Sequence, residues 1–307
     1  MDKKWLPLSG IIEDEYVRER NKRRDLIKDI QDNETIKSEN GKLIVYTANF
    51  NHPNSSMQHA DITPFEELLI DVGHTSTLFL MIDSPGGDPN IAEKLLIMCR
   101  ERCDCLKVIV PNTAKSAATL MTLGCDEILM GHLSELGPID PQISIISPEG
   151  IPVYVPAQSV IDGFKILSEG LRKTSSRESL EDPRAYLQIL SRLDPPTYDR
   201  ALKAQKLTEE FARVWLTQYM CKHSRQKADK IVNKLSDAKE WLSHGRAIDA
   251  DKAMNLLGKN DGLNVKKLSK DDDLWKLIWE LYVLSERHLQ LTKRAKLCES
   301  ENVSIHQ

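Results

Sequence analysis

The sequence lacks any long apolar run. A stretch of about 18 or more apolar residues would indicate a membrane-spanning helix, and none occurs among the 307 residues. The first residues, Met1-Asp2-Lys3-Lys4, lead into mixed sequence rather than into the charged-then-apolar order of an export leader. We therefore expect a soluble, cytoplasmic protein with no membrane partner.

Net charge is also small. The 42 lysines and arginines nearly balance the 46 acidic residues, which leaves a formal net charge of −4. Domains that bind nucleic acid usually carry a basic patch, so we expect no nucleic-acid partner. The sequence also lacks a glycine-rich nucleotide-binding loop, and any ATP-driven unfoldase partner would be a separate chain. The length suits one large α/β core with helical additions, or two domains.

Cysteine is present without a metal-binding pattern. Three of the six cysteines cluster at Cys99, Cys103 and Cys105, but no second Cys/His pair follows at the spacing of a zinc finger. Without an export leader, disulfides are not expected either. We predict buried free thiols here, with no metal site and no cofactor.

A strand, a turn and a helix follow one another in the middle of the chain. The apolar run Thr77–Ile82 ends at Asp83-Ser84-Pro85-Gly86-Gly87, and apolar residues then recur at helical spacing from Ile91 to Cys99. Asp88 and Pro89 suit a helix N-cap followed by a first-turn proline. This pattern predicts a strand that enters a helix through a glycine turn.

The same order is repeated immediately afterwards. A strand is predicted over Leu106–Val110, small residues follow around Ser116, and a third short strand is predicted over Glu127–Met130. Strands joined by helical crossovers form a parallel sheet covered by helices. We therefore expect an α/β fold, with the two turns at the same edge of its sheet.

The two predicted turns can together form a catalytic site. Paired glycines let the backbone expose its N–H groups, and a helix that starts with small residues exposes more of them. Together the turns can form an oxyanion hole with Ser116 as a nucleophile at its mouth. The alternative is purely structural, because Pro-Gly-Gly is a common turn and Ser-Ala-Ala commonly starts a helix.

The order of these blocks resembles a known family. Ser-Pro-Gly-Gly-Asp, then Ala-Lys-Ser-Ala-Ala-Thr-Leu, then Leu-Gly-Pro-Ile-Asp-Pro-Gln are similar to the serine dehydrogenase proteinases, Clp/crotonase-fold serine peptidases related to signal peptide peptidase A. The resemblance is strongest from Leu78 to Gln142 and continues more weakly through His244-Gly245 to Val265. It implies a spiral of β-β-α units with a parallel sheet, and an active site at Ser116.

By this resemblance the nucleophile is Ser116, and the backbone amides of Gly86 or Gly87 and of Ala117 form the oxyanion hole. Clp proteases pair the serine with a histidine in a segment that here contains none. Signal peptide peptidase relatives use a lysine on a later helix instead, and the corresponding candidate here is Lys165. A buried lysine can act as a base because desolvation lowers its pKa; a solvated lysine on an amphipathic helix is the alternative.

Two other basic side chains lie near the serine in the sequence. Lys115 immediately precedes Ser116, but adjacent residues point apart, which favours a surface role over that of a base. His132 follows the third predicted strand, and a solvated loop histidine is the simpler interpretation of it.

The remaining sequence predicts helical additions on either side of the core. We expect an N-terminal helical arm in residues 1–37, a peptidase domain in 38–265 with a helical insertion around 171–240, and a C-terminal helical tail in 266–307. A long helix is predicted over Asp271–Leu297, and residues 172–183 have the composition of a loop. The apolar surface of the last helix must be buried, either on its own core or in an oligomer, and we favour a homo-oligomer.

Three functions remain open at this point. The first is a serine endopeptidase that cleaves peptides or unfolded proteins with a Ser116–Lys165 dyad. The second is a crotonase-type acyl-CoA enzyme, which a hydroxyl at the reactive position and the lack of an evident acidic catalytic residue disfavour. The third is a catalytically silent relative that binds peptides or serves as a scaffold.

Overall fold

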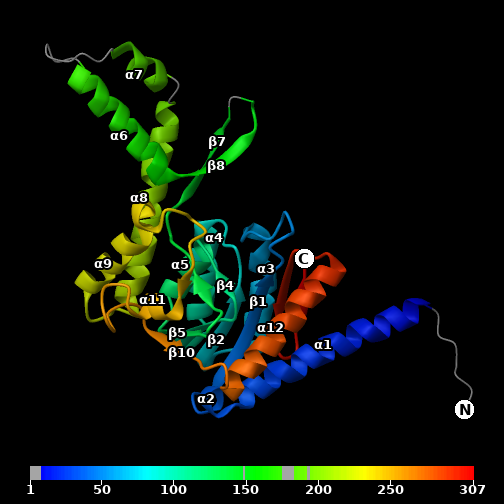
Figure 1. Cartoon of the computed structure of the whole chain (residues 1–307). Coiled ribbons are helices and arrows are strands. Elements are labelled where there is room, and N and C mark those ends of the chain that lie inside the picture. Colours follow the sequence, from blue (N-terminus) through cyan, green and yellow to red (C-terminus); the bar gives the residue numbers. More distant parts are fainter. Residues whose placement is uncertain (1–7, 148, 175–182, 192–193) are drawn as a thin grey trace, which may run out of the picture.

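The computed structural model describes residues 8–147, 149–174, 183–191 and 194–307. Its centre is a mixed, mostly parallel sheet with the strand order β10-β5-β3-β2-β1-β11-β12, and helices cover both faces (Figure 1). The strands are β1 Gly41–Ala48, β2 Thr75–Asp83, β3 Cys103–Val110, β5 Glu127–Met130, β10 Val265–Lys267, β11 Lys296–Glu299 and β12 Ser304–His306.

The parallel part of the sheet runs from β1 through β2, β3 and β5 to β10. Its strands contain the apolar runs that the sequence indicated, and α4 (Pro89–Arg100) connects β2 to β3 as expected. Asp88 caps α4 by accepting a hydrogen bond from Asn90 N, and Pro89 is its first residue. The predicted α/β class is confirmed.

Side chains alternate between the two faces of the sheet, as the pleat requires. On β1, Ile44 and Tyr46 face one core cluster, whereas Leu43 and Val45 face the other. The first cluster lies under α3 (Ile62–Val72), α4 and α5 (Ala117–Leu123). The second lies under α1 (Leu8–Asp32) and α12 (Asp273–Thr292), which lie side by side (Figure 1). The sheet is therefore buried on both faces, as parallel sheets usually are.

The C-terminal region differs from its prediction. The helix expected to reach Leu297 ends at Thr292, because Lys293 adopts a left-handed conformation (φ 53°) and turns the chain. The residues that follow form β11, which pairs antiparallel with β1, and β12, which pairs with β11. The apolar side of α12 packs on the chain's own core, through Leu274, Trp275, Ile278 and Leu281 among others. Its burial therefore needs no second subunit.

An arm extends from the sheet at the top of Figure 1. It consists of a hairpin, β7 Gln142–Ile146 with β8 Pro152–Pro156, and three helices, α6 Ala157–Thr174, α7 Pro183–Leu190 and α8 Pro195–Gln218. The loop expected over residues 172–183 falls mainly on 175–182, which lie outside the described residues. The chain then returns through α9 Arg225–Ser236, α10 Ala238–Trp241 and α11 Ala250–Met254.

A second, small sheet lies beside the main one. It orders β4 Thr113–Ala114, β6 Glu135–Leu136 and β9 Ile248–Asp249. Two short helices complete the described elements, α2 Glu34–Lys37 and the 3₁₀ turn η1 His59–Asp61. The domain boundaries given above remain predictions. In the structure, the N-terminal helix and the C-terminal strands both pack on the central sheet.

Among the described residues, no helix combines the length and apolar character needed to cross a bilayer. The cysteines are free thiols, and Cys99 and Cys103 are buried while Cys105 is half-buried. Burial raises the pKa of the Cys103 thiol to about 11. These thiols are therefore protonated and unreactive at neutral pH.

A buried carboxyl group gives a pH-dependent prediction. Burial, reinforced by Glu286, raises the pKa of Asp83 at the end of β2 to about 7. Between about pH 4 and 7 the folded chain binds a proton that the unfolded chain lacks, so the free energy of unfolding falls as pH rises. Asp83→Asn still accepts the bond from Thr113 N, 2.9 Å away, and should raise stability at pH 8 by up to about 4 kcal/mol.

Urea unfolding of the parent and of Asp83→Asn at pH 5 and pH 8 tests this. The gain should be larger at pH 8, and the exposed Asp104 of β3 supplies the control variant Asp104→Asn. An equal gain at both pH values would contradict the assignment.

Candidate active site

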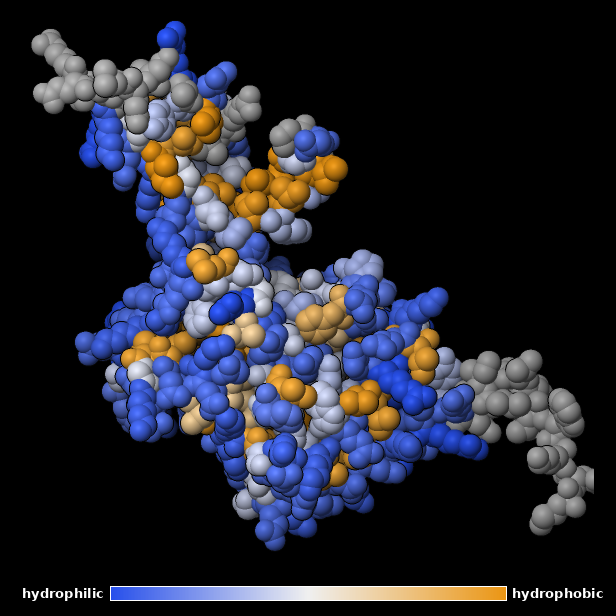
Figure 2. All heavy atoms as spheres, viewed as in Figure 1, coloured by the Kyte–Doolittle hydropathy of each residue, from blue (hydrophilic) through white to orange (hydrophobic). Residues whose placement is uncertain are grey.

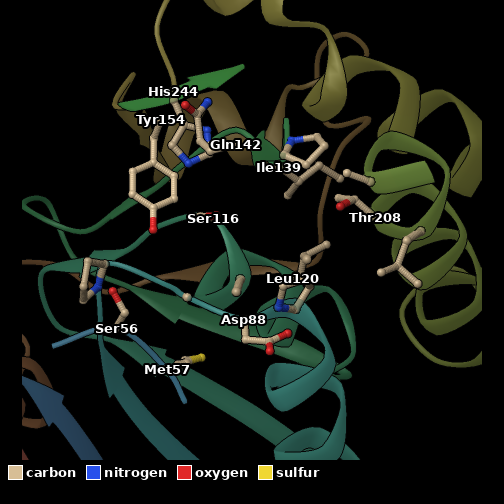
Figure 3. Close-up of a pocket in the computed structure, with 17 residues that line it drawn as sticks. Ser56, Met57, Asp88, Ser116, Leu120, Ile139, Gln142, Tyr154, Thr208 and His244 are labelled. Carbon is tan, nitrogen blue, oxygen red and sulfur yellow. The ribbon is translucent and has the colours of Figure 1, made fainter. Parts of the chain in front are cut away.

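A pocket of about 620 Å³ opens beside the carboxyl ends of β2 and β3 (Figure 3). The glycine turn after β2 and the start of α5 lie on one side of it, and the arm and the loop before β9 lie on the other. Its lining residues are Ser56, Met57, Pro85, Gly87, Asp88, Pro89, Ser116, Ala117, Leu120, Ile139, Pro141, Gln142, Tyr154, Ala204, Leu207, Thr208 and His244. The structure thus brings Ser116, Gly87 and Ala117 together, as the sequence predicted.

Ser116 sits between β4 and α5 in a strained conformation. Its φ of 53° and ψ of −119° lie in a region that residues with a side chain rarely adopt. Behind it, the Thr119 hydroxyl donates to Ala114 O at 2.7 Å and accepts from Gly137 N at 3.1 Å. Strain of this kind is retained where the surroundings fix it. A sharp strand-to-helix turn is how α/β-hydrolases present their nucleophilic serine.

The glycine turn is fixed from two sides. Ser84 forms a bridge with Ala114, next to the serine, and Gly87 forms one with Met57. In the second bridge, Met57 N donates to Gly86 O at 2.7 Å and Asp88 N donates to Met57 O at 3.1 Å. A Cβ on Gly86 would lie 2.5 Å from Lys115 O. Only glycine allows the two turns to approach this closely.

Two amides at the pocket have no partner. Within the described part of the chain, neither Gly87 N nor Ala117 N donates a hydrogen bond to another group. The Gly86 amide, by contrast, donates to Ser84 Oγ at 3.1 Å. Of the two glycines that the sequence left open, Gly87 therefore has the free donor. Unpaired backbone amides beside a serine hydroxyl are the components of an oxyanion hole.

The basic residues considered from the sequence lie elsewhere. Lys165 is exposed on α6 and does not line the pocket. Lys115 Nζ is held by the Glu135 carboxylate at 2.8 Å and by Leu136 O at 3.1 Å. His132 is exposed and packs against Trp275. None of the three is brought to the Ser116 side chain.

One histidine does line the pocket. His244 lies in the loop between α10 and β9, and its Nδ1 is 2.9 Å from Oδ1 of Asp140. The Asp140 side chain is only 3% exposed, whereas that of His244 is 26% exposed. The sequence did not indicate a role for either residue, because 104 positions separate them. The sequence contained only a weak indication that these residues belong to the site. Asp140 lies in the Leu-Gly-Pro-Ile-Asp-Pro-Gln block, and His244-Gly245 lies where the resemblance to the family is weaker.

Two curated proteins of Methanocaldococcus jannaschii are similar to this chain, and both are described as uncharacterized. One, MJ1495, is 29% identical over 157 residues, which cover 51% of this chain and 43% of that protein. The other, MJ0137, is 38% identical over 64 residues, which cover 21% of this chain and 22% of that protein. The chain thus spans less than half the length of either relative.

Among solved structures, the 1510-N membrane-bound stomatin-specific protease in complex with a substrate peptide has a TM-score of 0.29. It is 12% identical, and the match covers 74% of this chain and 94% of that one. A probable enoyl-CoA hydratase/isomerase from Mycobacterium abscessus has a TM-score of 0.27 and 10% identity, with coverage of 73% and 95%.

Part of the sequence also matches the model of a protein family. It spans residues 60–163, the model is described as ClpP-like SDH-type serine proteinase, and the match confirms the resemblance drawn from the motifs. The matched residues include the glycine turn, Ser116 and the free amides of Gly87 and Ala117. Residues 60–163 of this chain are therefore similar to the ClpP-like SDH-type serine proteinases.

Proposed function

We propose that this chain is a serine endopeptidase that cleaves peptides or unfolded proteins with Ser116 as its nucleophile. The observation that carries the proposal is the position of Ser116, held in a strained turn beside the unpaired amides of Gly87 and Ala117. Backbone strain clusters at functional sites, and a serine presented in a strained turn beside free amides fits a nucleophile.

In the proposed reaction, Ser116 Oγ attacks the carbonyl carbon of the scissile peptide bond. The carbonyl oxygen becomes an oxyanion, which accepts hydrogen bonds from the Gly87 and Ala117 amides. The C–N bond then breaks, the amine leaves with a proton, and water hydrolyses the acyl group on Ser116.

For the base, the sequence suggests a Ser-Lys dyad with Lys165. A lysine acts in this way only when desolvation lowers its pKa. Lys165 is exposed on α6, so the dyad requires the arm to carry it into the pocket and bury it when substrate binds. If the dyad operates, Lys165→Ala should abolish activity.

The nucleophile is tested with a fluorophosphonate probe, which phosphonylates activated serines. We expect the parent chain to be labelled and Ser116→Ala to remain unlabelled, with hydrolysis of unfolded casein falling by a factor of about 10³ or more. Circular dichroism should show that the variant is folded.

The matched control is Ser56→Ala, since Ser56 lines the same pocket and should be dispensable. A parent chain that is not labelled, although an active serine peptidase is labelled in parallel, would favour the silent scaffold. Labelling that survives in Ser116→Ala would assign the nucleophile to another residue.

We also propose a homo-oligomer, supported by apolar side chains on the arm. The hairpin exposes Ile146, Ile151, Val153 and Tyr154, and Ile166 on α6 is exposed nearby. Figure 2 shows this apolar surface gathered on the hairpin and the adjacent helices, apart from the largely hydrophilic body. Apolar surface of this kind usually marks an interface.

A further inference from the structure

We propose that a second pocket, formed by α1, α12 and β12, binds a small phosphate monoester whose organic part is apolar. The pocket has a volume of about 390 Å³, and in the described part of the chain it shares no lining residue with the pocket at Ser116. Figure 1 shows α1 beside α12, with the C-terminal strands, drawn in red, next to α12. A cavity of this size accommodates a small ligand. The assignment does not depend on the proposed peptidase function.

Basic side chains from four parts of the chain line this pocket. They are Arg20 and Arg23 of α1, His288 of α12, Arg294 in the turn after that helix, and His306 of β12. The fold brings these distant residues together, because α12 packs along α1 and β12 pairs with β11. Such a cluster attracts an anion unless neighbouring carboxylates neutralise it.

Two carboxylates act on this cluster and offset only part of its charge. Glu299 of β11 binds Arg23 through both oxygens, at 2.7 Å from Nε and 2.9 Å from Nη2, and it also accepts from Ser304 Oγ at 2.6 Å. Glu19 Oε2 lies 3.8 Å from His288 Nδ1, which is too far for a hydrogen bond. Three arginines face two carboxylates, so the pocket keeps a net positive charge even when both histidines are neutral.

Two of the basic side chains are buried with polar atoms that have no partner. His288 is 4% exposed, and neither of its ring nitrogens has a hydrogen-bond partner among the described residues. Arg23 is 1% exposed, and within the same part of the chain its Nη1 is likewise unpaired. Buried polar atoms in proteins are normally paired, and each exception needs an explanation. An anion held in this pocket would give these nitrogens an acceptor.

The electrostatics of the two histidines also indicate an anion. Burial lowers the pKa of His288, and the charge of Arg23 lowers it further. Burial and the charge of Arg294 lower the pKa of His306. A bound anion opposes these effects, because a negative charge nearby favours the protonated imidazole. Each protonated imidazole donates two hydrogen bonds.

The number of donors favours phosphate over carboxylate. Arg23 Nη1, two further arginine side chains and two imidazoles surround the pocket. A carboxylate has two acceptor oxygens, whereas a phosphate monoester has three and a charge near −2 at neutral pH. Arginine is also the side chain best suited to bind phosphate through paired N–H groups.

The exposed side of the pocket is suited to an apolar group. Tyr16 and Val17 of α1 line the pocket and are both exposed. The Tyr16 ring lies edge-on to the His288 ring, with 6.2 Å between the ring centroids. An aromatic or aliphatic group can pack on these side chains while the phosphate faces the arginines. We therefore expect an organic phosphate to bind more tightly than inorganic phosphate.

Isothermal titration calorimetry of the full chain with phenyl phosphate at pH 7 tests the site. Arg20 and Arg294 are exposed, so their replacement should leave the fold intact, which circular dichroism checks. Arg20→Gln and Arg294→Gln should each weaken binding by about 10-fold or more, because each removes a charge-assisted hydrogen bond. The matched control is Arg24→Gln, since Arg24 is exposed on α1, pairs with Asp25 and does not line the pocket.

Two further ligands separate the parts of the proposal. Inorganic phosphate should bind the parent chain at least about 10-fold more weakly than phenyl phosphate, because it lacks the ring that packs on Tyr16. Phenol, which lacks the phosphate, should give no heat of binding. Phenol that binds as tightly as phenyl phosphate would overturn the assignment to a phosphate.

Proton NMR of the histidine rings provides a second readout. Signals of His288 and His306 are identified by their absence in His288→Gln and His306→Gln. Saturating phenyl phosphate should raise the pKa of both by about 1, because a dianion then lies beside them. The signal of His223, which is exposed between α8 and α9, should not move.

The remaining outcomes are distinct. A parent chain that does not bind phenyl phosphate at millimolar concentration overturns the proposal. Binding that is equally tight in the parent, Arg20→Gln and Arg294→Gln places the ligand elsewhere and overturns it too, as does an unchanged pKa of both histidines at saturation. None of these results depends on labelling of Ser116, so this site can fail while the peptidase proposal stands.

Discussion

Gly87→Ala should reduce the labelling rate and peptide hydrolysis by about 100-fold or more, the loss expected when one oxyanion donor is removed. Gly87 has a φ of +150°, and a Cβ would lie 2.3 Å from Met57 N and 2.5 Å from Met57 O. The contact is with backbone, so it cannot be relieved by a side-chain rotation. The bridge between Gly87 and Met57 must open, and the Gly87 amide then leaves the proposed oxyanion hole.

Gly258 provides a matched control for this effect. Its φ of +148° is nearly the same, but a Cβ there would meet nothing within 4 Å. Gly258→Ala therefore carries the same backbone strain without displacing Met57, and should retain the parent labelling rate. Equal rates in the two alanine variants would show that the amide of Gly87 is not part of the hole.

Lys296→Met should lower the free energy of unfolding by about 3–5 kcal/mol. Lys296 on β11 and Asp61 in η1 are both completely buried, with Nζ 2.7 and 2.8 Å from the two carboxylate oxygens. Oδ2 of Asp61 also accepts from Tyr46 Oη at 3.1 Å and from Gln58 N at 2.8 Å. The substitution leaves this carboxylate buried without its cation.

Chemical denaturation measures the effect, with Lys203→Met as the control. Lys203 pairs with Asp199 at 2.6 Å on the exposed side of α8, and its loss should cost less than about 1 kcal/mol. The double variant Asp61→Asn/Lys296→Met should be less destabilised than the sum of its single variants, because no buried charge remains unpaired. A Lys296→Met variant as stable as Lys203→Met would contradict this account.

Local patterns were sufficient to predict the parallel core and the turn that holds Ser116. The run before Asp83 and the cap at Asp88 each lie within a few residues of the feature they specify, so periodicity and turn chemistry reveal them. The placement of Ser116 beside Gly87 followed from strand order, since parallel strands end at one edge. The free amide was assigned to Gly87 only when the structure showed that Gly86 N bonds to Ser84.

Features that depend on distant partners were not predicted. The strands β11 and β12 were not predicted, because the apolar spacing indicated a helix as far as Leu297. The burial of Lys296 in β11 depends on its ion pair with Asp61, 235 positions away. His244 and Asp140 are separated in the same way, by 104 positions. The helix carrying Lys165 was predicted, but the direction in which α6 leaves the core depends on tertiary packing and not on its own residues.

The pairing of β1 with β11 also affects the order in which the chain folds. During synthesis, residues 41–48 emerge long before residues 296–299 can pair with them, and contacts of such sequence separation form slowly. Until then β1 has an open edge that other chains can join. Over the same period Asp61 is not paired with Lys296. Asp61 accepts a hydrogen bond from Gln58 N, and the neighbouring Met57 holds the Gly87 turn, so this segment is then less firmly fixed. We expect peptidase activity to appear only after β11 docks, so that a partly synthesised chain carries Ser116 without a competent site.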